Sequence, residues 1–167
     1  MLTRVATMQS KPLPLRDRDL LRTRAYVDGS WVDGDSGETF PVVDPATGET
    51  IAEVPRLGAA ETRRAIEAAE RALPAWRARP AKERARVLRR IADLMLENAD
   101  DLALLLTAEQ GKPLPESHAE IEYAASFLEW FGEEAKRVYG DTIPQPTPDR
   151  RILVTKQPVG VTGGITP

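Results

Sequence analysis

Alternating apolar and polar positions predict β structure in the first part of the chain. Residues 25–32 alternate about Asp28 and Gly29, a pair typical of a tight hairpin turn. A second pair of strands is predicted over 39–45 and 49–55, which flank small turn-forming residues. The pattern therefore predicts two short β hairpins before any long helix.

Apolar residues take on helical spacing after Gly58, and three helices are expected. The first is expected to stop or kink at Pro74, because proline lacks the N–H that continues a helix. The second begins at Pro80 and reaches Gln110, and the third covers about 115–139. The segment 98–101 is a candidate interruption of the second helix, whose expected buried face consists of Val87, Leu88, Ile91 and Met95.

Glycine and proline residues separate the last segments of the chain. Gly111 is predicted to cap the second helix in a left-handed conformation. The proline-rich stretch 143–150 predicts a bend, and the weakly alternating 151–160 predicts an edge strand or an arm. Residues 159–167 resemble the beginning of a buried strand followed by a glycine-rich turn, a pattern typical of nucleotide-binding units. They do not match G-x-G-x-x-G.

The composition narrows the class of protein. A chain of 167 residues with 41% hydrophobic and 29% charged residues is expected to be globular, and its net charge of −3 gives no reason to expect nucleic-acid binding. The absence of cysteine excludes disulfides, cysteine metal sites and a cysteine nucleophile within these residues. No stretch has the length and apolarity of a membrane span or a secretory signal, so a cytoplasmic protein is expected.

The candidate chemistry within the chain is sparse. His118 is the single histidine and has no evident nucleophile beside it, so a surface role is favoured over catalysis. The neighbouring Glu133 and Glu134 are expected to point apart on a helix surface, and no cluster has the spacing of metal ligands. In the aromatic run 127–131, Phe127 and Trp130 are three residues apart. Both core packing and an aromatic wall at a pocket remain open for this run.

Several motifs in order resemble the N-terminal part of the aldehyde dehydrogenase family. They are AYVDGSWVDGDSGETFPVVDPATGETIAEVP, WRARPAKERARVLRRIADLM, EQGKPLPES, EWFGEEAKRVYGDTIP and QPVGVTGGITP. The resemblance extends from about residue 20 to residue 167. EQGKP together with EIEYAASFLEWFGEEAKRVYGDTIP is most similar to the succinate-semialdehyde dehydrogenase branch.

The resemblance implies an α/β fold and the oxidation of an aldehyde to a carboxylic acid. In this family a cysteine thiolate attacks the carbonyl, hydride passes to NAD or NADP, and a glutamate activates the water that releases the acid. An asparagine side chain and a backbone N–H stabilise the oxyanion. None of these catalytic residues matches a position in this chain, which resembles the front third of a complete enzyme. Residues 1–167 alone are therefore expected to be inactive and to bind no cofactor tightly.

The resemblance also assigns residues to the sites of a complete enzyme. Ile165, Thr166 and Pro167 are expected to line the cofactor. Tyr123, Phe127 and Trp130 lie on the helix that borders the substrate tunnel in the family, which favours the pocket over core packing.

The expected organisation has four parts and allows one main alternative. The arm 141–158 is expected to join subunits into a homo-oligomer by adding to a neighbouring sheet. A non-catalytic short product that binds full-length subunits through this arm is the alternative to an enzyme, and a helical interaction module is a third possibility. The expected parts are a flexible tail (1–19), a β and helical part (20–140), the oligomerisation arm (141–158) and the first strand of an incomplete Rossmann-like domain (159–167).

Overall fold

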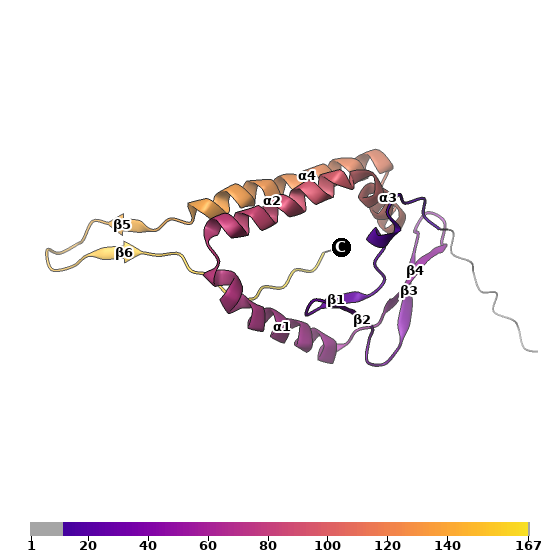
Figure 1. The fold of residues 1–167 in the computed structure, drawn as a ribbon, viewed down its shortest axis with the longest axis horizontal. Helices are drawn as coiled ribbons and strands as arrows, with labels where there is room; N and C mark the ends of the chain where they lie inside the picture. Colours follow the sequence, from indigo (N-terminus) through magenta and orange to yellow (C-terminus); the bar gives the residue numbers. More distant parts are fainter. Residues whose placement is uncertain (1–11, 167) are drawn as a thin grey trace, which may run out of the picture.

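Short hairpins and longer helices follow one another in the computed structural model, which describes residues 12–166 (Figure 1). The strands form three separate antiparallel pairs, β1 with β2, β3 with β4 and β5 with β6. In chain order the elements are η1 (Arg18–Leu20), β1 (Ala25–Val27), β2 (Ser30–Val32), β3 (Thr39–Val43), β4 (Thr50–Pro55), α1 (Ala59–Ala78), α2 (Ala81–Glu97), α3 (Ala99–Gln110), α4 (Leu114–Glu134), η2 (Ala135–Arg137), β5 (Asp141–Ile143) and β6 (Ile152–Val154). The α/β class and both predicted hairpins are confirmed.

The first hairpin turns where the sequence predicts it. Asp28 and Gly29 have φ values of 50° and 80°, and two consecutive positive φ angles are what a two-residue type I′ turn requires. This turn sets the register in which Tyr26 lies opposite Trp31. The two rings are 5.1 Å apart at their centroids, so the turn and the cross-strand aromatic pair support the same register.

The expectation of three helices is wrong, because the second expected helix is two helices that break at Asn98. The Asn98 side chain donates its Nδ2–H to the carbonyl of Leu94 at 2.8 Å, and its backbone leaves the helical conformation with φ −113° and ψ 19°. A short amide side chain that bonds nearby backbone competes with the helix ladder. The chain therefore turns at Asn98, and α3 leaves in a new direction (Figure 1).

Two expected helix ends also differ from the structure. The sequence predicts a stop or a kink at Pro74; α1 continues past this residue to Ala78, so the stop is wrong. Pro74 removes one helix hydrogen bond, that of its own missing N–H, and only four residues of α1 follow it. The last long helix ends at Glu134 and not near 139, since the next residues tighten into the 3₁₀ turn η2.

The helices α2 and α4 pack side by side, and α3 packs against α4 at one end of this pair (Figure 1). Small residues allow the close approach. A Cβ on the buried Gly132 of α4 would lie 3.4 Å from the carbonyl oxygen of Ala85 on α2. Apart from Leu105, the buried apolar residues are all alanines: Ala68, Ala85, Ala92, Ala103, Ala108 and Ala125. The described residues therefore form a thin core, and many larger apolar side chains remain exposed.

Two buried carboxylates attach distant backbone to the helix starts. Glu61, the third residue of α1, accepts the N–H of Asp35 at 2.9 Å and that of Gly58 at 2.9 Å. Asp101, the third residue of α3, accepts the N–H groups of two residues of the N-terminal segment, Arg16 at 3.0 Å and Asp17 at 2.8 Å. The partial positive charge of a helix N-terminus also favours a carboxylate there. Both side chains therefore stabilise the fold as anions.

These carboxylates predict an acid-sensitive stability. Backbone N–H donors, led by Asp35 for Glu61 and by Asp17 for Asp101, lower the pKa of each carboxyl below its ordinary value of 4.5 or 3.8. A depressed folded-state pKa contributes stability above the ordinary value, and that stability is lost as the pH falls through the folded-state pKa. We expect Glu61→Gln and Asp101→Asn to lower the melting temperature at neutral pH and to flatten its fall in acid.

Thermal melts of the purified protein, measured from neutral pH down through the ordinary carboxyl pKa values, test the expectation. Glu67→Gln, which removes an exposed carboxylate from the same helix as Glu61, is the matched control. An acid profile of Glu61→Gln and Asp101→Asn that is identical to the wild-type profile would contradict it.

Gly111 ends α3 and brings it against the turn between β3 and β4. Its φ of 79° confirms the predicted left-handed cap, and its N–H donates to the carbonyl of Thr107 at 2.8 Å. A Cβ at this position would lie 2.9 Å from Cγ of Pro45. Gly111 is therefore required for its backbone conformation and also for its close approach to Pro45.

The C-terminal segment differs from the expected strand. Residues 159–166 form no strand, because no other described segment supplies the hydrogen-bonding ladder that a strand needs. Residues 159–163 line a hollow with Ile66, Glu70 and Leu73 of α1. Pro167 and residues 1–11 lie outside the described residues. The four-part division of the chain, with its Rossmann-like last segment, remains a prediction.

Candidate functional site

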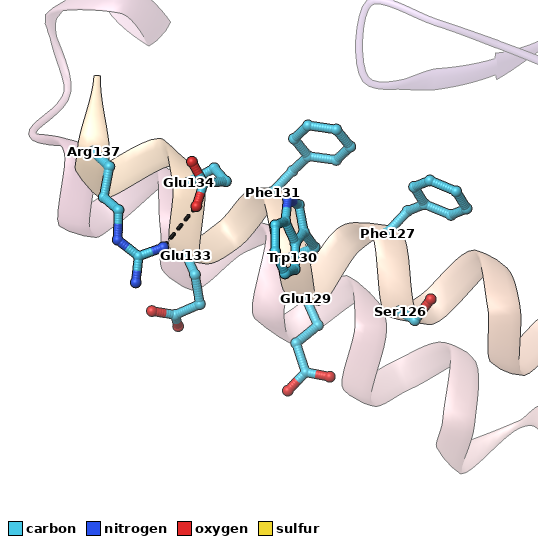
Figure 2. Close-up of a pocket in the computed structure, with 8 residues that line it drawn as sticks. All are labelled: Ser126, Phe127, Glu129, Trp130, Phe131, Glu133, Glu134 and Arg137. Atoms are coloured by element: carbon cyan, nitrogen blue, oxygen red, sulfur yellow. Dashed lines mark hydrogen bonds and ion pairs between the residues drawn. The ribbon is translucent and has the colours of Figure 1, made fainter. Parts of the chain in front are cut away.

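Aromatic side chains lie along the outer face of α4. The rings of Tyr123 and Phe127 meet edge to face with centroids 4.7 Å apart, and those of Phe127 and Phe131 stack at 6.5 Å. This ladder follows the i, i+4 spacing of one helix face. Figure 2 shows the rings of Phe127 and Phe131 projecting to the same side of α4. Tyr123 and Trp130 are each 65% exposed and Phe127 is 45% exposed, so these rings do not form a core among residues 12–166.

A hollow of about 610 Å³ opens beside this ladder at the C-terminal half of α4 (Figure 2). Phe127, Trp130 and Phe131 form its apolar part. The structure therefore brings two of the predicted tunnel residues, Phe127 and Trp130, to one hollow, while Tyr123 joins them through its contact with Phe127. The polar lining residues are Ser126, Glu129, Glu133, Glu134 and Arg137.

Each carboxylate of the hollow is held by a cation. Glu129 binds Arg89 of α2 at 2.5 Å and Glu134 binds Arg137 at 2.6 Å. Glu133 binds Lys136 at 2.6 Å, and this contact lowers the pKa of the Glu133 carboxyl. Because every carboxylate that lines the hollow is paired with a cation, the apolar rings are the part of the lining left to contact a ligand.

Sequence reasoning did not include these ion pairs in the site. The i, i+3 spacing of Glu133 with Lys136 and of Glu134 with Arg137 is a signal that could have identified two of them. It agrees with the prediction that the two glutamates lie on the helix surface. The pair between Glu129 and Arg89 spans 40 residues and has no local signal.

The remaining candidates do not form a catalytic or metal site. Nε2 of His118 lies 3.8 Å from Asp100, whose carboxylate binds Arg16 at 2.7 Å, so His118 lies beside a surface ion pair. Among residues 12–166, no group of three or more histidine, cysteine, aspartate or glutamate side chains is placed to hold a metal ion. Within the same residues no helix combines the length and apolarity needed to cross a membrane. The cytoplasmic location remains a prediction.

The predicted cofactor residues lie at the end of the described chain. Ile165 is fully exposed and Thr166 is exposed, while Pro167 lies outside the described residues. A Cβ on Gly163 or Gly164 would meet no atom within 4 Å, so this glycine run forms no cradle around a phosphate. These residues do not by themselves fit a dinucleotide, and their role in cofactor binding remains a prediction.

Comparison with known proteins identifies the family. The sequence model of the aldehyde dehydrogenase family matches residues 31–167. This chain belongs to the aldehyde dehydrogenase family. The hairpins, the four helices and the arm are therefore the N-terminal part of an aldehyde dehydrogenase fold.

Relatives with semialdehyde substrates match nearly the whole chain. A glutarate-semialdehyde dehydrogenase of Pseudomonas aeruginosa is 68% identical over 155 residues, which cover 93% of this chain and 32% of the relative. The NADP⁺-dependent succinate-semialdehyde dehydrogenase of Escherichia coli K12 is 57% identical over the same coverage of 93% and 32%. The crystal structure of a Burkholderia pseudomallei succinate-semialdehyde dehydrogenase superimposes with a TM-score of 0.85 at 58% identity, covering 88% of this chain and 30% of that chain. The chain thus spans about a third of the length of these relatives.

Proposed function

We propose that these residues are the N-terminal part of an NAD(P)-dependent enzyme that oxidises a short semialdehyde to the dicarboxylic acid. The 68% identity to a glutarate-semialdehyde dehydrogenase carries this proposal. Both glutarate semialdehyde and succinate semialdehyde are candidate substrates, since relatives named for each match nearly all of the chain. NAD or NADP accepts the hydride in the complete enzyme.

Within that enzyme the chain contributes binding surface. We assign the aromatic face of Tyr123, Phe127 and Trp130 to the wall of the substrate tunnel. The exposure of these rings supports the assignment, because an exposed apolar face lowers its free energy when it contacts an apolar ligand or a covering layer. Ile165, Thr166 and Pro167 would contact the cofactor, and the catalytic thiol, base and oxyanion donor would come from other residues of the enzyme.

The substrate proposal is tested by assaying the complete enzyme with three aldehydes. We expect reduced nicotinamide to form fastest, in terms of kcat/KM, with glutarate semialdehyde or succinate semialdehyde. An uncharged aldehyde of the same length is the control and is expected to react at least about tenfold less efficiently, because one charged contact is lost. Equal kcat/KM values for all three aldehydes would contradict the semialdehyde assignment.

The tunnel assignment predicts separate effects on kinetics and stability. In the complete enzyme we expect Phe127→Ala and Trp130→Ala to raise the apparent KM by about tenfold, equivalent to about 1.4 kcal/mol. If the rings were core residues, truncation would cost about 3–5 kcal/mol of folding free energy instead. Steady-state kinetics and thermal melts distinguish the two. Phe40→Ala, which removes a similarly exposed ring from β3, is the control. Variants that melt early but keep wild-type kinetics would favour core packing.

The arm supports a further proposal, the assembly of subunits through residues 141–158. In the structure β5 pairs with β6 in a two-stranded ribbon that projects from the end of α4 opposite α3 (Figure 1). Two-stranded ribbons are marginally stable alone, and among the described residues neither outer edge has a partner. Leu153 is 75% exposed on this ribbon. An added strand from a second copy would satisfy the open edge and cover such side chains.

A further inference from the structure

A second hollow, of about 630 Å³, lies where α1, α2 and the end of the arm meet. It is separate from the aromatic face of α4, because its lining includes none of Tyr123, Phe127 and Trp130. All of its charged lining residues are cations, and among residues 12–166 no carboxylate lines it. The cations come from four segments of the chain: Arg77, Arg84, Lys136 and Lys156.

Two of these cations are already held within the protein. Arg84 donates from Nη1 to the carbonyl oxygens of Arg77 and Arg79 at the C-terminal end of α1. Lys136 binds Glu133 at 2.6 Å. The other two, Arg77 and Lys156, make no ion pair with any side chain of residues 12–166. Carbonyl oxygens hold Arg84 without cancelling its charge, so the hollow keeps a net positive charge, and Arg77 and Lys156 are its two cations without a side-chain ion-pair partner among residues 12–166.

The remaining lining selects the size and character of a ligand. Trp76 and Leu73 provide an apolar wall. The guanidinium of Arg79, which is not among the lining residues, lies 5.7 Å from the centroid of the Trp76 ring. Cations that converge on a concave surface with apolar walls create a positive potential that attracts anions. A ligand with two negative charges and a short apolar body would neutralise both free cations and cover the wall.

We propose that this hollow binds a small organic dianion, either a short dicarboxylate or a phosphate monoester. A short dicarboxylate and a phosphate monoester both carry a pair of negative charges on a compact body. The site does not depend on the proposed oxidation, because it uses none of the residues assigned to the tunnel or the cofactor.

The position of Lys156 links this site to the arm. Lys156 follows the last arm strand, β6, by two residues, whereas Arg77 lies near the end of α1. A dianion bound by both would hold the end of the arm against α1. Because the coupling between two sites is reciprocal, a contact that holds the end of the arm against α1 would also strengthen the binding of the dianion. We therefore expect the dianion to slow amide exchange in residues 152–157.

Calorimetric titration of the purified protein tests the site, with inorganic phosphate, succinate and glutarate as probes at constant ionic strength. We expect saturable binding of at least one dianion, and the probe that binds most tightly distinguishes phosphate from dicarboxylate. Arg77→Gln and Lys156→Gln are each expected to weaken binding about tenfold, or about 1.4 kcal/mol. Chloride, a monoanion, is expected not to compete at the same ionic strength.

Lys82→Gln is the matched control, because Lys82 is an exposed cation of α2 that does not line the hollow. It is expected to bind the dianion as the wild type does, and circular dichroism should show unchanged helix content in all three variants. Absence of binding to the wild type would overturn the proposal. Equal weakening by Lys82→Gln would also overturn it, since that result indicates a general charge effect.

Discussion

Purified residues 1–167 are expected to yield no reduced nicotinamide from glutarate semialdehyde or succinate semialdehyde, with NAD or with NADP. Covalent aldehyde oxidation needs a thiol nucleophile, and the chain contains no cysteine. Loss of even one oxyanion donor lowers the rate by about 10²–10³, and here the nucleophile is missing as well. The carboxylates around the aromatic hollow do not replace it, because each is already paired with a cation. The expected rate is therefore indistinguishable from the rate without protein.

Absorbance of reduced nicotinamide measures this directly, and the complete enzyme under the same conditions is the positive control. Repeated turnover by residues 1–167 would contradict the expectation. Mixing residues 1–167 with the complete enzyme tests the alternative, in which the chain is a non-catalytic short product that binds full-length subunits through the arm. If that alternative holds, added residues 1–167 will exchange into the complete enzyme's assemblies and lower its activity. Residues 1–167 that carry Lys82→Gln, a change on α2 outside the arm, are the control and will act in the same way.

Local sequence patterns predicted the parts of the fold that depend on neighbouring residues. The turn at Asp28 and Gly29 and the cap at Gly111 both require positive φ angles, and glycine or aspartate at those positions is a direct signal. The break at Asn98 had a weaker signal, because an asparagine inside a helix is often tolerated. The pattern therefore suggested an interruption there but not two separate helices.

Long-range contacts could not be predicted in the same way. Glu61 binds the backbone of Asp35 and Asp101 binds that of Arg16, across 26 and 85 residues. At sequence level both look like ordinary acidic residues in the first turn of a helix. Their function as attachment points depends on where the chain returns in space.

Helical periodicity identified an apolar face on α2 but not what covers it. None of the four residues expected to be buried is buried: Val87 and Ile91 are 37% and 41% exposed, and Leu88 and Met95 are half-buried. The buried residues of α2 are Ala85 and Ala92. Close packing against α4 selects small side chains at the contact, as the approach of Gly132 to Ala85 shows. Contacts between helices also limited the prediction of the site. Sequence spacing placed Phe127 and Trp130 on one helix, but the hollow also includes Glu129, whose ion-pair partner Arg89 lies on α2.

Gly140→Ala is expected to open the arm and to weaken the subunit association that depends on it. Gly140 comes directly before β5, and a Cβ there would overlap the carbonyl oxygen of Val154 and lie 3.2 Å from its carbonyl carbon. Both atoms are backbone, so no side-chain rotation relieves the overlap. The nearest strand pair, Asp141 with Val154, would have to separate. Because an isolated two-stranded ribbon is only marginally stable, loss of its first pair is enough to open it.

The helices should be unaffected, because α2 and α4 pack against each other and α3 packs against α4, whereas β5 and β6 contact chiefly each other. We therefore expect unchanged helical circular dichroism together with subunit association at least about a hundredfold weaker, equivalent to about 2.7 kcal/mol or two to three backbone hydrogen bonds. Sedimentation velocity over a series of protein concentrations measures the strength of subunit association. Gly163→Ala is the control, since a Cβ there meets nothing within 4 Å. If Gly140→Ala associates as strongly as the wild type does, the ribbon is not the contact that joins subunits, and the exposed apolar faces of the helices become the alternative interface.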